Sequence, residues 1–201
     1  MKALFTSIYF LLISYLSVAM PAKTVAYTIS PLKKGSYDAF LIEMTMKGNA
    51  TGKTRLSLPF EIGLYRPQDH IKVIDVVNGQ KHHLMAEDSS SYQIEHKPNA
   101  ILTVKYIVEN ALKDSLPTLN EVYAQMLTNK YFYVLGSSFW IVPEDSSAAK
   151  YSISLKWQGF PSTWTYLSSH SGNGSTQTFQ ASLGDFYDAV YMGGDFVFIK
   201  N

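Results

Sequence analysis

The segment Tyr151-Ser152-Ile153-Ser154-Leu155-Lys156-Trp157 places a large apolar residue at every second position and a polar residue between them. Successive side chains of a β-strand point to opposite faces of a sheet, so this pattern predicts a strand with one face on a core. Residues 40–47 and residues 102–108 alternate in the same way. Together these segments indicate a sheet that covers a core with one of its faces.

Turn-forming residues divide the apolar runs into many short segments. They are Lys47-Gly48-Asn49, Asn78-Gly79, Lys97-Pro98-Asn99, Pro143-Glu144-Asp145 and residues 171–174. Asn78-Gly79 suits a tight hairpin, because both central residues of a type I′ turn need a positive φ. Residues 71–77 are apolar on both faces, which indicates a strand covered from both sides. Many short strands with frequent turns predict an all-β fold, a β-sandwich of short antiparallel strands, rather than a parallel α/β fold.

One segment departs from the period of two. Between Ser115 and Thr128 the apolar residues follow the i, i+3, i+4 spacing of a helix face; they are Leu119, Val122, Tyr123, Met126 and Leu127. Pro117 and Thr118 provide a start signal. We therefore expect one short helix that covers an open end of the sandwich.

Composition and charge exclude several classes of protein. The 201 residues are 46% hydrophobic and 14% aromatic, which is typical of a folded globule and not of a disordered chain. The net charge is +1 without a basic stripe, so nucleic acid is not expected as a partner. The absence of cysteine excludes disulfides, thiolate metal sites and cysteine nucleophiles, and it favours a bacterial envelope protein over a secreted animal module.

The first residues have the three-part plan of a secretory signal peptide. Met1-Lys2 is basic, residues 3–20 are apolar, and small residues follow. We expect cleavage near Ala19 or near Ala26, followed by a single domain over residues 27–201. The alternative is an uncleaved membrane anchor, for which the apolar run is slightly short. The predicted location is periplasmic or extracellular, with no membrane segment beyond the leader.

The familiar catalytic motifs are missing from the sequence. It contains no HExxH zinc motif, no GxSxG elbow and no P-loop. His82 and His83 are adjacent, so on a strand they would point to opposite faces and would not bind one metal. Acidic residues are scattered, as is typical of solvated turns. We predict no catalytic residue, no metal ligand and no cofactor in this chain.

Six segments follow one another in a recognisable order. They are residues 27–30, Leu56–Gly63, residues 102–108, residues 131–143, residues 154–164 and residues 191–196. In this order they resemble the N-terminal domain of the glycyl aminopeptidase family, which are gluzincin-type zinc metallopeptidases. The resemblance covers nearly the whole region after the leader. It implies that this β domain precedes a thermolysin-like catalytic domain with HExxH and a distal glutamate, often followed by a PDZ-like domain.

The resemblance also implies a role and a place of contact. Zinc is expected only in the catalytic domain, which has no counterpart here. The chain is therefore either a fragment or truncated gene product, or a domain that works alone or with a separately encoded partner. Its expected role is to pack against the catalytic domain, in cis or in trans, and to wall one side of the substrate cleft. The expected contact lies where the chain leaves the domain, at Tyr191, Gly193, Gly194 and Asp195, beside an exposed apolar patch.

Two other functions remain open from the sequence. A stand-alone envelope module for carbohydrate or protein would present an aromatic platform, for which the candidates are Trp140, Trp157, Trp164, Tyr166 and Phe179. Trp157 lies in the apolar phase of its strand, however, which favours core packing for that residue. A complete hydrolase would need two carboxylates that converge in a pocket with at least one perturbed pKa.

Overall fold

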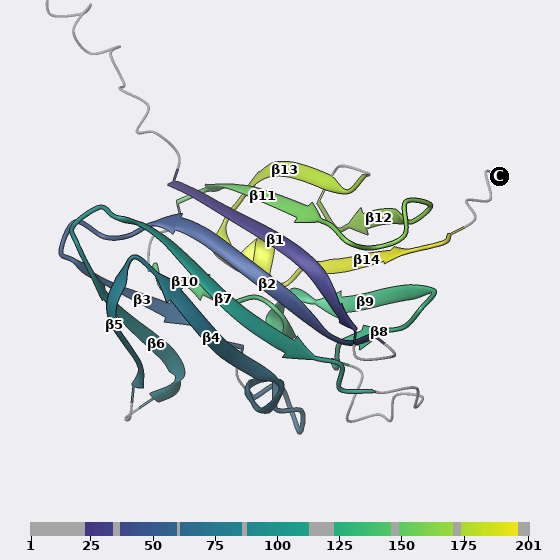
Figure 1. The fold of residues 1–201 in the computed structure, drawn as a ribbon, viewed down its shortest axis with the longest axis horizontal. Coiled ribbons are helices and arrows are strands. Elements are labelled where there is room, and N and C mark those ends of the chain that lie inside the picture. Colours follow the sequence, from purple (N-terminus) through teal and green to yellow (C-terminus); the bar gives the residue numbers. More distant parts are fainter. Residues whose placement is uncertain are drawn as a thin grey trace, which may run out of the picture.

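The computed structural model describes residues 23–33, 37–59, 61–85, 88–112, 123–145, 149–170 and 174–196. The predicted signal peptide lies outside these residues except for its last four positions. The described residues form strands in three sheets, together with one short α-helix and two short 3-10 helices (Figure 1). The all-β fold predicted from the sequence is therefore confirmed.

The large sheet has six strands in the order β13-β11-β1-β2-β7-β4. Its strands are β1 (Lys23–Lys33), β2 (Tyr37–Lys47), β4 (Ile71–Val77), β7 (Ile101–Glu109), β11 (Tyr151–Trp157) and β13 (Thr176–Ala181). β1 runs parallel to β11, and the other neighbours in this sheet are antiparallel. The first described strand thus lies inside the largest sheet. β2, β7 and β11 are the three strands that the alternation predicts.

Two antiparallel four-stranded sheets complete the fold. The small sheet, in the order β10-β3-β6-β5, contains β3 (Lys53–Ser57), β5 (Gly79–Met85), β6 (Asp88–His96) and β10 (Val142–Pro143). The C-terminal sheet, in the order β12-β14-β9-β8, contains β8 (Met126–Leu127), β9 (Tyr131–Leu135), β12 (Thr165–Ser168) and β14 (Val190–Gly194). The 3-10 helices are η1 (Pro67–His70) and η2 (Gly136–Ser138).

One apolar core joins the three sheets. It contains Ile42 from the large sheet, Ile94 from the small sheet and Phe132 from the C-terminal sheet, each fully buried. The hydroxyl of Tyr27 donates to the carbonyl of Ile141 at 2.9 Å, and the Ile141 N–H donates to the Tyr106 hydroxyl at 3.3 Å. β1 and β7 are thereby both fixed to the segment that leads into β10. Burial raises the pKa of both phenols.

Two sequence predictions around β4 are wrong. β4 is a strand, but it lies at the edge of the large sheet, and Ile74 and Val77 are 46% and 42% exposed. Its apolar character does not distinguish an edge strand from a covered one. Asn78-Gly79 does not close a hairpin, because β4 pairs with β7 and β5 pairs with β6 in another sheet. Asn78 has φ 64°, whereas the glycine serves a close approach: a Cβ on Gly79 would lie 2.6 Å from Cγ1 of Val76.

The helix predicted over residues 115–128 falls mostly outside the described residues. At its C-terminal end the prediction is wrong, because Met126–Leu127 forms β8 and pairs with β9. Met126 packs against the small cluster around Tyr65, whereas Leu127 belongs to the main core. Two successive apolar residues are thus explained by a strand between two clusters as well as by one face of a helix. The α-helix that the structure describes is α2 (Leu183–Tyr187), which begins after Ser182; the Ser182 Oγ accepts the Asp185 N–H at 3.0 Å.

Candidate docking surface

β14 carries most of the residues predicted to contact a catalytic domain. The side chain of Tyr191 is fully buried, and its hydroxyl donates to the carbonyl of Phe186 at 2.9 Å. A Cβ on Gly193 would overlap the ring of Phe132, and a Cβ on Gly194 would lie 2.7 Å from Cβ of Tyr131. The two glycines are therefore needed because side chains of the neighbouring strand β9 occupy the space beside them.

Of the four predicted contact residues, Asp195 alone has an exposed side chain. Its backbone N–H donates to the carbonyl of Lys130 at 3.2 Å, next to the end of β9. Because strand side chains alternate, the inward positions of β14 are Tyr191 and Gly193, and the outward positions are Val190, Met192 and Gly194, of which only the first two carry side chains. The contact with a catalytic domain stays a prediction. The side chains of β14 that are placed to make it are Val190 and Met192, on the face opposite to Tyr191.

Apolar side chains cover the outward side of the C-terminal sheet. Leu167 pairs with Met192, Met192 with Tyr133, and Tyr133 with Met126, so one row crosses all four strands. All four side chains are half-buried, and burial raises the pKa of Tyr133. We define the outer face as this row together with its outward neighbours: Met126, Tyr131, Tyr133, Leu135, Leu167, Val190 and Met192.

The outer face continues into a small apolar cluster beyond β8. Met126 packs against this cluster, which contains Tyr65, Leu112 and Ala124. The Tyr131 hydroxyl donates to the sulfur of Met126 at 3.1 Å, and the Tyr131 side chain is 37% exposed. The side chains of the outer face other than Tyr131 are half-buried, so the exposed apolar patch expected near the C-terminal exit stays a prediction.

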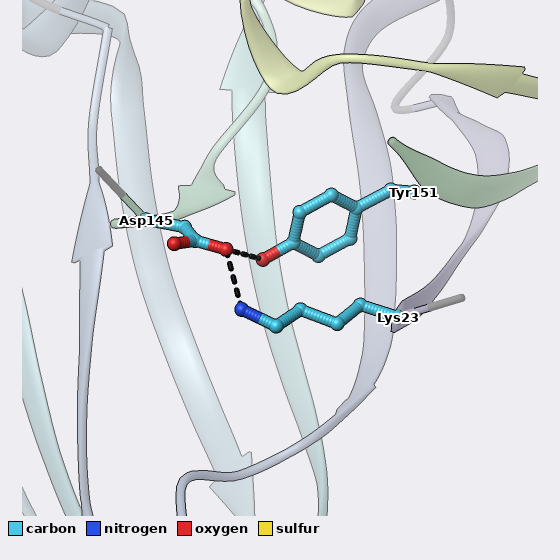
Figure 2. Close-up of polar contacts among 3 residues, drawn as sticks. All are labelled: Lys23, Asp145 and Tyr151. Carbon is cyan, nitrogen blue, oxygen red and sulfur yellow. Dashed lines mark hydrogen bonds and ion pairs between the residues drawn. The ribbon is translucent and has the colours of Figure 1, made fainter. Parts of the chain in front are cut away.

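A cavity of 740 Å³ opens near the start of β1. One carboxylate oxygen of Asp145 there accepts from the Lys23 ammonium at 2.6 Å and from the Tyr151 hydroxyl at 2.5 Å (Figure 2). Burial, followed by the contact with Asp145, raises the pKa of Tyr151. The neighbouring Glu144 pairs with Arg55 at 2.8 Å. The two acidic groups at the cavity are thus each engaged with a cation, which is typical of a structural clamp that joins β1 and β11.

The structure gives little support to the other two functions. Of the proposed platform residues, Trp140, Trp157, Trp164 and Tyr166 are buried in the core, and only Phe179 is half-buried, where it stacks on His170 with centroids 4.2 Å apart. Within the described ranges, no group of three or more histidine, aspartate or glutamate residues is placed to hold a metal ion.

His70 and His96 have structural contacts. His96 is buried; its Nε2 lies 2.8 Å from the Thr54 hydroxyl and its Nδ1 2.8 Å from the carbonyl of Lys97. His70 stacks on Tyr65, and its ring centroid lies 5.8 Å away. His82 and His83 occupy consecutive positions of β5. Among helices of the described residues, none has the length and apolar character needed to cross a membrane.

Comparisons with known proteins agree with this picture. The family model of the Peptidase M61 N-terminal domain matches residues 26–190. A crystal structure of an aminopeptidase N family protein from Idiomarina loihiensis matches with a TM-score of 0.62 and 18% identity, over 86% of this chain and 29% of that chain. The present chain therefore corresponds in length to less than a third of that neighbour.

A second structural match has no bearing on the fold. A type I cohesin–dockerin complex from Clostridium thermocellum matches with a TM-score of 0.27 and 16% identity, over 63% of this chain and 83% of that chain. At that score the likeness supports no inference. A comparison with curated protein sequences gives no match.

Proposed function

Because the chain belongs to the Peptidase M61 N-terminal domain family, we propose that it serves as the non-catalytic β domain of an exported zinc metallopeptidase of the aminopeptidase type. The family match over residues 26–190 is the observation that carries this proposal, since it includes twelve complete strands, β2 to β13, and parts of β1 and β14. The domain supplies no zinc ligand, general base or nucleophile. Zinc belongs to the peptidase domain, and the peptidase domain is the partner.

The role of the domain is to pack against the peptidase domain and to wall one side of its substrate cleft. A wall of this kind needs a rigid scaffold, and a core drawn from three sheets provides one. It also needs a surface that a second domain can cover, and the apolar outer face of the C-terminal sheet supports that requirement. Neither zinc nor a water nucleophile has to be held by this domain.

Export to the periplasm or the cell exterior is part of the proposal. It is supported by the basic and apolar segments of residues 1–20 and by the small residues that follow. The cysteine-free composition is compatible with an oxidising compartment, because no thiol can form an unwanted disulfide there.

The first test is the reading frame around this gene. We expect HExxH and a distal glutamate either downstream in the same frame or in an adjoining gene. The second test is biochemical: the purified 201-residue chain should bind no stoichiometric zinc and should not hydrolyse aminoacyl 4-nitroanilides, whereas addition of the encoded peptidase domain should give zinc-dependent hydrolysis. Stoichiometric zinc and hydrolysis by the 201-residue chain alone would contradict the non-catalytic role.

A further inference from the structure

We propose that the outer face of the C-terminal sheet is the surface on which the peptidase domain docks. The inference rests on the proposed function and adds the side chains that make the contact. They are Met192 at the centre, Leu167, Tyr133 and Met126 in the same row, and Tyr131, Leu135 and Val190 beside them.

The composition of this face is typical of a surface that another protein covers. Its central row is apolar on every strand, and none of the described outward side chains of the four strands carries a charge. The row is about 14 Å across, as three interstrand spacings of about 4.8 Å require. A contiguous apolar area of this kind on a soluble domain is typical of a contact site for protein.

The large sheet provides an internal comparison, because its outward side mixes charged and polar pairs with apolar residues such as Leu41, Ile101 and Ile107. Glu43 and Lys105 form a cross-strand ion pair at 3.3 Å, and the hydroxyls of Thr45 and Thr103 lie 3.1 Å apart. Serine and threonine alternate with the inward residues of β1 and β11. The outward side of the large sheet therefore includes charged side chains, whereas none of the described outward side chains of the C-terminal sheet is charged.

The position of the face identifies its occupant. β14 is the last described strand and lies between β12 and β9 (Figure 1). Asp195 follows β14 directly. The Idiomarina loihiensis protein has most of its length outside the matched domain, since only 29% of that chain is covered. A domain attached after β14 would be held at high effective concentration beside this sheet. We therefore assign the face to the peptidase domain and not to a second copy of the chain.

The test measures binding between this 201-residue chain and the zinc-loaded peptidase domain encoded after it or beside it, by isothermal titration. Met192→Lys places an ammonium at the centre of the face and should weaken binding about 30-fold or more, because the charge would be desolvated without a partner. Leu41→Lys is the matched control: Leu41 is a half-buried, outward residue at the middle of β2, on the outward side of the large sheet. It should change the dissociation constant less than twofold, and both variants should keep the wild-type circular dichroism spectrum.

The outcomes separate this inference from the proposed function. Equal affinity of Met192→Lys and wild type would overturn the docking face and leave the peptidase partner standing. Loss of affinity with Leu41→Lys alone would overturn it as well, and would assign docking to the large sheet. If light scattering shows a dimer that Met192→Lys abolishes, and the chain does not bind the peptidase domain, a second copy is the occupant and the inference fails. A genome that encodes no peptidase domain after or beside the chain would remove the occupant and the proposed function together.

Discussion

Three buried tyrosines should make this domain unfold at alkaline pH. Tyr27, Tyr106 and Tyr191 are at most 1% exposed, and burial raises the pKa of each phenol in the folded state. In the unfolded chain these phenols ionise near pH 10. Above that pH the unfolded state binds fewer protons than the folded state, so the free energy of unfolding must fall as the pH rises. Below pH 10 both states hold the protons, and the three groups contribute no pH dependence.

The size of the effect follows from the number of phenols. One proton difference changes the free energy of unfolding by about 1.4 kcal/mol per pH unit once the unfolded phenols are ionised. Because the unfolded phenols are half ionised at pH 10, the three together lower the free energy of unfolding by about 3 kcal/mol between pH 10 and pH 11, and by about 4 kcal/mol per pH unit above that. A domain of this size is stabilised by roughly 5–15 kcal/mol in total. We therefore expect unfolding to become complete within about two or three pH units above pH 10.

The assay is urea unfolding followed by far-ultraviolet circular dichroism at pH 9, 10 and 11. Tyr106→Phe serves as the control, since it removes one of the three protons and should reduce the fall in the free energy of unfolding between pH 10 and pH 11 by about 1 kcal/mol, whatever its effect at pH 9. Lysine deprotonation contributes equally to both proteins and cancels in this comparison. If the wild-type slope above pH 10 is no steeper than that of Tyr106→Phe, the buried-phenol argument is refuted.

The remaining predictions concern the last strand, the helix and the leader. Gly193→Ala should lower the free energy of unfolding by about 1–3 kcal/mol, because the new methyl group overlaps the ring of Phe132; urea unfolding at pH 7 measures it, and an unchanged midpoint would contradict the overlap. Ser182→Ala should cost about 1 kcal/mol through loss of the cap of α2, with Ser182→Thr as the near-neutral control in the same measurement. N-terminal sequencing of the exported protein should show cleavage after Ala19; cleavage after Ala26 would remove the first four residues of β1 and would contradict the pairing of that strand.

Strands with one buried face could be predicted from the sequence, since burial imposes a period of two. This is clearest at β11, where inward Ile153 and Leu155 are fully buried and the serines between them face outward. The same rule fails where both faces are apolar. Residues 71–77 are such a case: they form β4, which lies at the edge of the large sheet. Its place at the edge depends on its pairing with β7, about 30 residues later in the sequence, which the local pattern does not reveal.

The candidate site shows the same limit. In Val190-Tyr191-Met192-Gly193-Gly194 both phases are apolar or glycine, so the sequence indicates the strand and not the face that looks outward. The inward phase is decided by Phe132 of β9, against which Gly193 has to pack. The row across β12, β14, β9 and β8 could not be predicted, because it requires the register of four strands that are separated in sequence.

The position of β1 inside the large sheet sets an order of events for the growing chain. β2 can pair with β1 as soon as it is made, but the other edge of β1 has to wait for β11, and the clamp from Lys23 to Asp145 joins residues 122 positions apart. Until that late segment arrives, one edge of the earliest strand stays open and the large sheet cannot be completed. In a ribosome-bound or transported chain, the pairs β1–β2, β2–β7 and β5–β6 need no residue of β11, whereas the large sheet is completed only when β11 and β13 are available.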